Sequence, residues 1–325
     1  MLSQEEVLER LGLADSEFAR GIFERCGVHR RRLDLGPDFL ARPLQGRATE
    51  IEDGLLEHSI RAVGELPLDL SAVRVVVSAS LYTVGCPTLA QRLSEHFGLD
   101  PSADKYHLSG VGCASAVPIM RLAGQTLREH PGGQALVIAA DCMSGILTQV
   151  ASDDPKAKVI GSAIFGDGCA AALISNDGSG EGPSILASQV HQIAGTLDAV
   201  TLALSSEDGY LHLARELPDL AGAGIADLVD EFLGDSGLHR SAIDHWIVHP
   251  GGRRIIESVQ DALELAREDV TVSWDVLAEY GNVGTPSIFY VLRDTLERNQ
   301  PRPGEHALMV TIGPGVTVGL MLLRW

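Results

Sequence analysis

Mostly apolar, strand-like segments that alternate with helix-like segments constrain this 325-residue chain most strongly. Residues 73–81 form a run rich in β-branched side chains, and residues 134–141 and 245–249 have the same character. Such runs are typical of strands in a sheet that is covered on both faces. Strands that alternate with helices build mainly parallel sheets. The sequence therefore predicts an α/β protein.

The same alternation occurs twice along the chain. Helices are predicted over residues 3–26, 48–66, 88–98, 226–233, 253–265 and 288–297, and further strands over 160–175, 185–190, 210–213 and 306–325. A polar, glycine-rich link at 176–182 separates the two sets. We therefore predict two similar halves, residues 1–178 and 179–325, with the second set arising by internal duplication.

Charge and cysteine usage exclude several classes of protein. The net charge of −19 disfavours nucleic acid and anionic membrane surfaces as partners. The sequence has no apolar run of transmembrane length, and its acidic N-terminus does not resemble a signal peptide. The five cysteines are widely spaced and form no CxxC pair, which predicts neither a disulfide framework nor a zinc site. We expect a cytoplasmic protein.

Cys113 lies in the turn Gly-Val-Gly-Cys-Ala, directly before an apolar run with helical period. A cysteine at a helix N-terminus faces unpaired N–H groups and the positive end of the helix dipole, which favour the thiolate. Its pKa can fall from about 8.5 to about 3.5–7.5 in such a place. The alternative is a small buried cysteine in a core turn. This stretch alone does not decide between a nucleophile and a packing residue.

Two further turns beside glycine carry reactive side chains. His249 ends a predicted strand, and Asn282 precedes a predicted helix. Strand C-termini and helix N-termini meet on the side of an α/β sheet where ligands bind. A thiolate, an imidazole and an amide N–H donor together make an acyl-transfer site, with Cys113 taking the acyl group. Asp141 and Asp167, near strand ends, are predicted to orient loops rather than react.

Five motifs in order give the chain a family resemblance. They are Gly-Val-Gly-Cys113-Ala, Phe165-Gly-Asp-Gly, His249-Pro-Gly-Gly, Gly-Asn282 through Pro286, and Gly-Pro-Gly315-Val-Thr. The sequence resembles the thiolase superfamily and, within it, the type III polyketide synthases, also called chalcone-synthase-like enzymes. The ketosynthase III branch usually follows the histidine with Gln-Ala-Asn, so Pro-Gly-Gly favours the polyketide branch. The resemblance implies a thiolase-like fold with α-β-α-β-α layers.

The resemblance also implies roles for the three reactive residues. Cys113 would accept a starter acyl group from coenzyme A, and His249 and Asn282 would hold the thioester oxygen of malonyl-CoA during decarboxylation and condensation. No permanently bound cofactor is implied, since coenzyme A thioesters are substrates. Neither carboxylate nor cysteine completes a metal pair of His245 with His249, so we expect no metal. The family suggests a homodimer and admits an acyl carrier protein as a partner.

Further positions are assigned from the same resemblance. Phe165 matches a gatekeeper phenylalanine, and the position of a second gatekeeper corresponds to Leu211, which is smaller and not aromatic. Cys86 belongs to a loop that crosses the family's dimer interface toward the cavity. Residues at the positions of coenzyme A contacts are Arg30, Arg31, Arg32 and Arg254. From its residues alone, the run of three arginines fits a solvated turn as well as a phosphate contact.

Two departures leave alternatives open. The family opens with a strand, whereas this chain begins near the first helix, so that strand is expected to be missing or replaced. Loss of a central strand would leave backbone groups unpaired. Besides polyketide synthesis, the residues fit a ketosynthase-III-like condensing enzyme, an acyl transferase without extension, or an inactive partner subunit.

Overall fold

The computed structural model describes residues 1–33, 42–81, 85–147, 156–178, 182–204 and 209–325. The first half contains β1 (Leu2–Ser3), α1 (Gln4–Arg10), α2 (Glu17–Arg25), β2 (Arg30–Arg31), α3 (Leu44–Gly64), β3 (Val73–Ser80), α4 (Leu89–His96), β4 (Asp104–Ser109), η1 (Gly112–Ala114), α5 (Ala116–Leu127), β5 (Gln134–Cys142), η2 (Met143–Ile146), α6 (Lys156–Ile164) and β6 (Asp167–Ser175). The second half contains β7 (Ser184–Gln192), η3 (Leu197–Ala199), β8 (Val200–Leu204), β9 (Gly209–Leu213), α7 (Leu217–Gly222), α8 (Ile225–Asp235), η4 (Arg240–Ala242), β10 (His245–Val248), α9 (Arg253–Leu263), η5 (Glu268–Val270), α10 (Thr271–Tyr280), α11 (Pro286–Asn299), β11 (His306–Gly313) and β12 (Thr317–Arg324).

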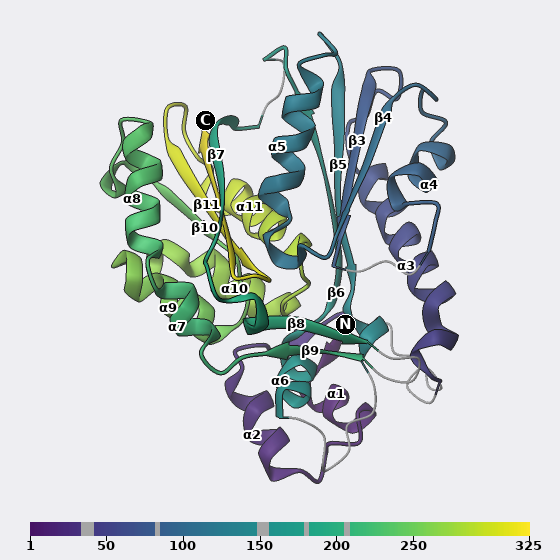
Figure 1. Cartoon of the computed structure of the whole chain (residues 1–325), viewed down its shortest axis with the longest axis vertical. Coiled ribbons are helices and arrows are strands. Elements are labelled where there is room, and N and C mark those ends of the chain that lie inside the picture. Colours follow the sequence, from purple (N-terminus) through teal and green to yellow (C-terminus); the bar gives the residue numbers. More distant parts are fainter. Residues whose placement is uncertain (34–41, 82–84, 148–155, 179–181, 205–208) are drawn as a thin grey trace.

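Two four-stranded sheets form the framework of the described chain (Figure 1). Their strand orders are β4-β3-β5-β6 and β10-β11-β12-β7. In both, two parallel strands (β3 with β5, β10 with β11) are followed by an antiparallel one (β6 or β12). The shared pattern supports the predicted duplication, and the proposed boundary at residue 178 falls between strands of different sheets.

The first sheet has no described strand beside β6, whereas in the second sheet β7 lies beside β12. This difference agrees with the expectation that an opening strand is missing or replaced. The missing strand is not a central one, because β3 pairs directly with β5, with Val77 opposite Val137. The chain begins instead with the short pair β1 and β2, in which Leu2 lies opposite Arg31.

Side chains on the two faces of each sheet enter different hydrophobic clusters. Val75 and Val77 of β3 pack with α5 and α11, which lie between the two sheets (Figure 1). Val76, between them in sequence, belongs to the other cluster, which includes Leu93 of α4 and Leu55 of α3. This alternation follows from the two-residue period of a strand. The expected layers of helix, sheet, helix, sheet and helix are confirmed.

Most predicted elements are present. The helices predicted over residues 3–26 are α1 and α2, and α1 begins with a capping box in which Ser3 and Glu6 bond reciprocally. Strands β1, β2, β4 and β8 and helices α7 and α10 are additional elements. Residues 160–164, predicted with the strand that follows, are the end of helix α6 instead.

Candidate active site

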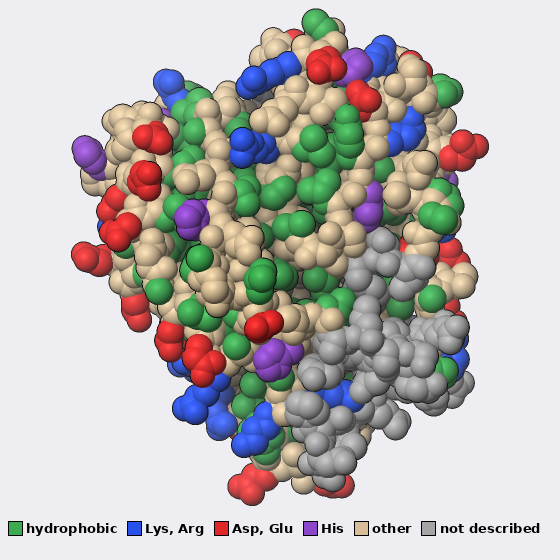
Figure 2. All heavy atoms as spheres, in the orientation of Figure 1, with side chains coloured by type: hydrophobic (Ala, Val, Ile, Leu, Met, Phe, Trp, Pro, Cys, Tyr) green, Lys and Arg blue, Asp and Glu red, His purple; other side chains and the backbone are tan. Residues whose placement is uncertain are grey.

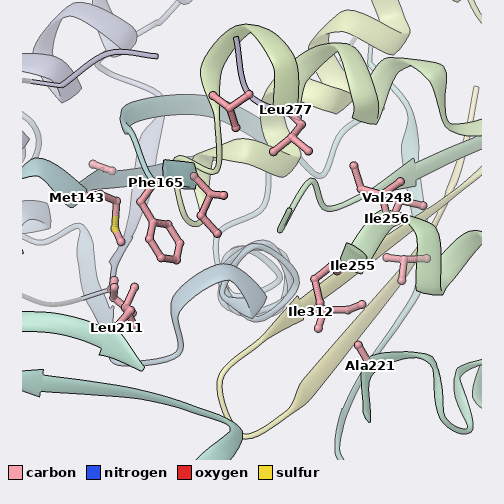
Figure 3. Close-up of a cluster of buried hydrophobic side chains, with 14 of the residues drawn as sticks. Met143, Phe165, Leu211, Ala221, Val248, Ile255, Ile256, Leu277 and Ile312 are labelled. Atoms are coloured by element: carbon pink, nitrogen blue, oxygen red, sulfur yellow. The ribbon is translucent and has the colours of Figure 1, made fainter. Parts of the chain in front are cut away.

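A cavity of about 380 Å³ lies where the two halves meet. Its lining includes Cys113, His249 and Asn282, which come from the turn before α5, the end of β10 and the turn before α11. The structure thus brings the three predicted reactive residues to one cavity. The rest of the wall is mainly aliphatic. Three of its side chains, those of Met143, Phe165 and Leu211, lie near one another in Figure 3.

Cys113 lies in η1, one short turn before α5, as predicted. Its thiol lies 3.7 Å from Asn282 Oδ1 and is placed to donate to that oxygen. Burial raises the pKa of the thiol to about 12, and the negative charge of Asp141 acts in the same direction. The lowered pKa expected from the helix N-terminus is therefore wrong. At neutral pH Cys113 is a protonated thiol.

His249 follows β10 and continues the sheet, since its N–H donates to the carbonyl oxygen of Val310 at 2.9 Å. Glycine suits the turn after it, because a Cβ on Gly251 would make a tight contact of 3.2 Å with the imidazole Cδ2. Neither ring nitrogen has a hydrogen-bond partner among the described residues. Burial lowers the pKa of His249 to about 3, so the ring is neutral. A neutral imidazole can accept one proton and donate another.

The side-chain amide of Asn282 has a fixed orientation. Its Nδ2 donates to the Gly251 carbonyl oxygen at 3.1 Å, and its Oδ1 accepts from the Gly284 N–H at 2.9 Å. The backbone of Asn282 is also held, through a parallel bridge to Phe165. Because an amide nitrogen carries two hydrogens, Asn282 retains a second N–H beyond the one given to Gly251. This hydrogen is available to a ligand oxygen.

Asp141 links the turns that carry Cys113 and Asn282 through hydrogen bonds. Its carboxylate accepts from the N–H groups of Leu81 and Thr285, at 2.5 and 2.8 Å. Thr285 Oγ1 in turn donates to the Gly112 carbonyl oxygen at 2.9 Å, beside Cys113. Burial raises the pKa of Asp141 to about 7, although the two backbone donors oppose this shift. Asp141 therefore orients loops, as predicted.

Asp167, in β6, likewise orients a loop, namely the segment that follows β5. Its carboxylate accepts from the Ser144 N–H at 2.7 Å, in the segment that also carries Met143. The prediction that Asp167 orients a loop is thus confirmed.

The predicted pocket residues fall into two groups. Phe165 and Leu211 line the cavity and are 5% and 6% exposed, so both are positioned to limit a bound acyl group. Cys86 is exposed and lies outside the lining of its own chain's cavity. Its predicted place in the cavity of a second subunit remains a prediction.

One of the predicted coenzyme A contacts is wrong. Arg31 is fully buried and donates to Gln4 Oε1 and to the carbonyl oxygens of Ser162 and Ala163. It therefore closes the C-terminal end of α6 and is inaccessible to a phosphate. Arg30 and Arg32 are exposed, and Arg30 bonds Glu279 at 2.6 Å. Neither lines the cavity, so their coenzyme A contact stays a prediction.

Arg254 does line the cavity, together with Arg25 and Arg253. Figure 2 shows basic side chains gathered at the lower left, beside α2 and below α9 as these helices lie in Figure 1. Arg25 and Arg253 are not predicted as cavity residues, because the sequence does not show which exposed side chains of α2 and α9 border the cavity. The three exposed arginines give the cavity entrance a basic character within an acidic protein, although Arg253 is paired with Glu257 at 2.8 Å.

Among the residues that the structure describes, no three histidine, cysteine, aspartate or glutamate side chains are grouped so that they could bind a metal ion. No helix in this part of the chain combines the length and the apolar character that a membrane span requires.

Comparisons with known proteins agree with this geometry. Residues 185–325 match the family described as chalcone and stilbene synthases, C-terminal domain, and residues 48–232 match the FAE1/type III polyketide synthase-like family. A 3,5-dihydroxyphenylacetyl-CoA synthase of Amycolatopsis balhimycina is 30% identical over 99% of this chain and 89% of its own length. The alpha-pyrone synthesis polyketide synthase-like Pks18 of Mycobacterium tuberculosis is 33% identical over 93% of this chain and 80% of its own.

Solved structures show the same fold. The crystal structure of PKS-I from the brown alga Ectocarpus siliculosus superposes with a TM-score of 0.87 at 27% identity, covering 99% of this chain and 94% of that one. The 1,3,6,8-tetrahydroxynaphthalene synthase of Streptomyces coelicolor superposes with a TM-score of 0.90 at 23% identity, covering 100% and 95%. The thiolase-like fold predicted from the motifs is confirmed.

Proposed function

The chain belongs to the type III polyketide synthase family, and we propose that it loads an acyl group from an acyl-CoA onto Cys113 and extends it with malonyl-CoA. One observation carries this proposal. A thiol, a neutral imidazole and an oriented amide border one cavity, whose entrance is cationic and whose wall is aliphatic. A nucleophile and two oxyanion donors are what thioester condensation requires.

Loading begins at the thiol of Cys113. The neutral ring of His249 accepts its proton, and the sulfur attacks the carbonyl carbon of the acyl-CoA. The bond to the coenzyme A sulfur breaks, and His249 returns the proton to that leaving thiolate. Because the resting thiol is protonated, transfer of its proton accompanies attack rather than preceding it.

Condensation then uses the two donors. Malonyl-CoA loses its carboxylate as CO₂, and the electron pair of the broken bond passes to an enolate. The free N–H of Asn282 and a ring N–H of His249 stabilise the enolate oxygen. The enolate carbon attacks the carbonyl carbon of the Cys113 thioester, and the bond from that carbon to the Cys113 sulfur breaks. Cys113 leaves as a thiolate and takes a proton from solvent. The product is an acyl-CoA that has gained two carbons.

The quaternary structure and location belong to the same proposal. We propose a cytoplasmic homodimer that takes no permanently bound cofactor, in which Cys86 of one subunit contributes to the cavity of the other. The exposure of Cys86 supports a contact of this kind. The coenzyme A phosphates are proposed to bind at Arg254, with Arg30 and Arg32 further along the surface.

Intact-protein mass spectrometry tests the proposal. The protein is incubated with a panel of acyl-CoAs, with and without malonyl-CoA, beside a Cys113→Ala control. We expect an acyl adduct on the wild type alone, which is lengthened or discharged when malonyl-CoA is added. An adduct that malonyl-CoA leaves unchanged identifies an acyl transferase instead. Absence of an adduct with every donor contradicts the proposal and favours an inactive partner subunit.

A further inference from the structure

The polarity of the cavity changes along its length. Three arginines, Arg25, Arg253 and Arg254, stand at the entrance, and aliphatic side chains from α6 and the β8–β9 hairpin form the wall. Apart from the three reactive residues and those arginines, Cys26 supplies the one polar side chain of the described lining. This distribution matches an amphiphile with an anionic head and an apolar tail.

Polar groups beside the described wall already have partners. The Cys26 thiol donates to the Phe23 carbonyl oxygen at 3.1 Å. The carbonyl oxygen of Ile164 accepts from the Asn282 N–H at 2.8 Å. Leu211 lies opposite Leu202 in the hairpin ladder. Against these residues a ligand hydroxyl would lose its water without gaining an unpaired side-chain partner from the described wall, which is costly.

We propose that the starter is an unsubstituted aliphatic acyl group, bound with its chain against Ile160, Met143, Val200, Leu211 and Leu213. This inference rests on the proposed function and names the substrate class of the same site. Phe165 is the one aromatic side chain in the described lining, so the wall offers little for stacking an aromatic starter. Each methylene that moves from water to an aliphatic wall improves binding by about fourfold.

The test measures loading alone. The wild-type protein is mixed with one acyl-CoA at a time, without malonyl-CoA, and formation of the Cys113 adduct is followed by rapid-quench mass spectrometry. The donors are acetyl-, hexanoyl-, octanoyl- and decanoyl-CoA. We expect the second-order rate constant of loading to rise at least tenfold from hexanoyl- to decanoyl-CoA.

Two matched donors sharpen the test. The first, 10-hydroxydecanoyl-CoA, differs from decanoyl-CoA by one hydroxyl and is expected to load at least about fivefold more slowly. The second, 4-hydroxycinnamoyl-CoA, has an aromatic ring and a phenol and is expected to load more slowly than octanoyl-CoA. A Cys113→Ala sample reports non-specific acylation.

The outcomes distinguish failure of the proposed function from failure of the aliphatic starter. If no donor acylates Cys113, the proposed function fails. If donors acylate Cys113 but the rates are independent of chain length, or the hydroxylated or aromatic donor loads fastest, the function stands and the aliphatic starter is refuted.

Discussion

Replacement of Arg31 by methionine tests whether this arginine serves the fold or the substrate. The methionine keeps an unbranched apolar stem but removes the guanidinium. Gln4 Oε1 and the Ser162 carbonyl oxygen then lose the donor that Arg31 supplies, whereas the Ala163 carbonyl oxygen still accepts from Gln4 Nε2 at 2.9 Å. The contact of the guanidinium with the Phe23 ring, 5.6 Å from its centroid, is also lost.

The expected loss is a difference between opposing terms. A hydrogen bond from a charged donor contributes about 1.5–3 kcal/mol, and two acceptors lose theirs. Burial of the guanidinium itself is costly, as its pKa of about 10 indicates, and the methionine avoids that cost. We expect a net destabilisation of about 2–4 kcal/mol. With an unfolding entropy of about 2.1 cal/mol/K per residue, Tm should fall by about 3–6 °C.

Calorimetry and steady-state kinetics measure the two effects separately. Arg31→Met should lower Tm and leave KM for the acyl-CoA within about twofold of the wild-type value. The matched variant Arg254→Ala removes an exposed charge at the entrance, and should raise KM about two- to fivefold without a change in Tm. An Arg31→Met protein with unchanged Tm and a raised KM would refute the structural role.

Four further predictions concern the site itself. The rate of Cys113 alkylation by iodoacetamide should rise steadily from pH 6 to 10 without a plateau, because the pKa of the thiol is raised to about 12. The substitution Asp141→Asn should increase this alkylation rate at pH 8, because it removes a negative charge that raises the pKa of the thiol. Asn282→Asp should slow condensation about 10²–10³-fold, measured as CO₂ release, while adduct formation on Cys113 persists. Leu211→Phe should narrow the range of starters in a product screen, and an unchanged profile would count against Leu211 as a gate.

The sequence predicts those parts of the fold that are marked by apolar runs or by a regular spacing of apolar residues. Residues 73–81 and 134–141 are continuous apolar runs, and they become β3 and β5 with nearly the predicted bounds. Strand β4 escaped prediction because its sequence, Asp-Lys-Tyr-His-Leu-Ser, is polar and only partly buried. As an edge strand it needs no apolar side chains on both faces.

The motifs locate the reactive residues but not their electrostatics. Cys113 lies in a turn before a helix, as predicted, but its pKa is raised rather than lowered. The expected lowering depends on one helix alone, whereas burial and the carboxylate of Asp141, which raise the pKa, involve other elements. The same limit applies to Arg31, since a run of arginines does not show which side chain turns inward. Such properties depend on tertiary contacts.

Asp141 links the turn that carries Cys113 to the turn that carries Asn282. Cys113 belongs to the first half and Asn282 to the second, so their separation depends on how the halves are joined. Asp141, on β5, binds the Thr285 N–H, and Thr285 binds the Gly112 carbonyl oxygen. The contact is close: Gly284 has a φ of 71°, and a Cβ there would lie 2.2 Å from Asp141 Oδ2. A side chain at residue 284 would therefore displace the carboxylate and, through Thr285, the turn that carries the nucleophile.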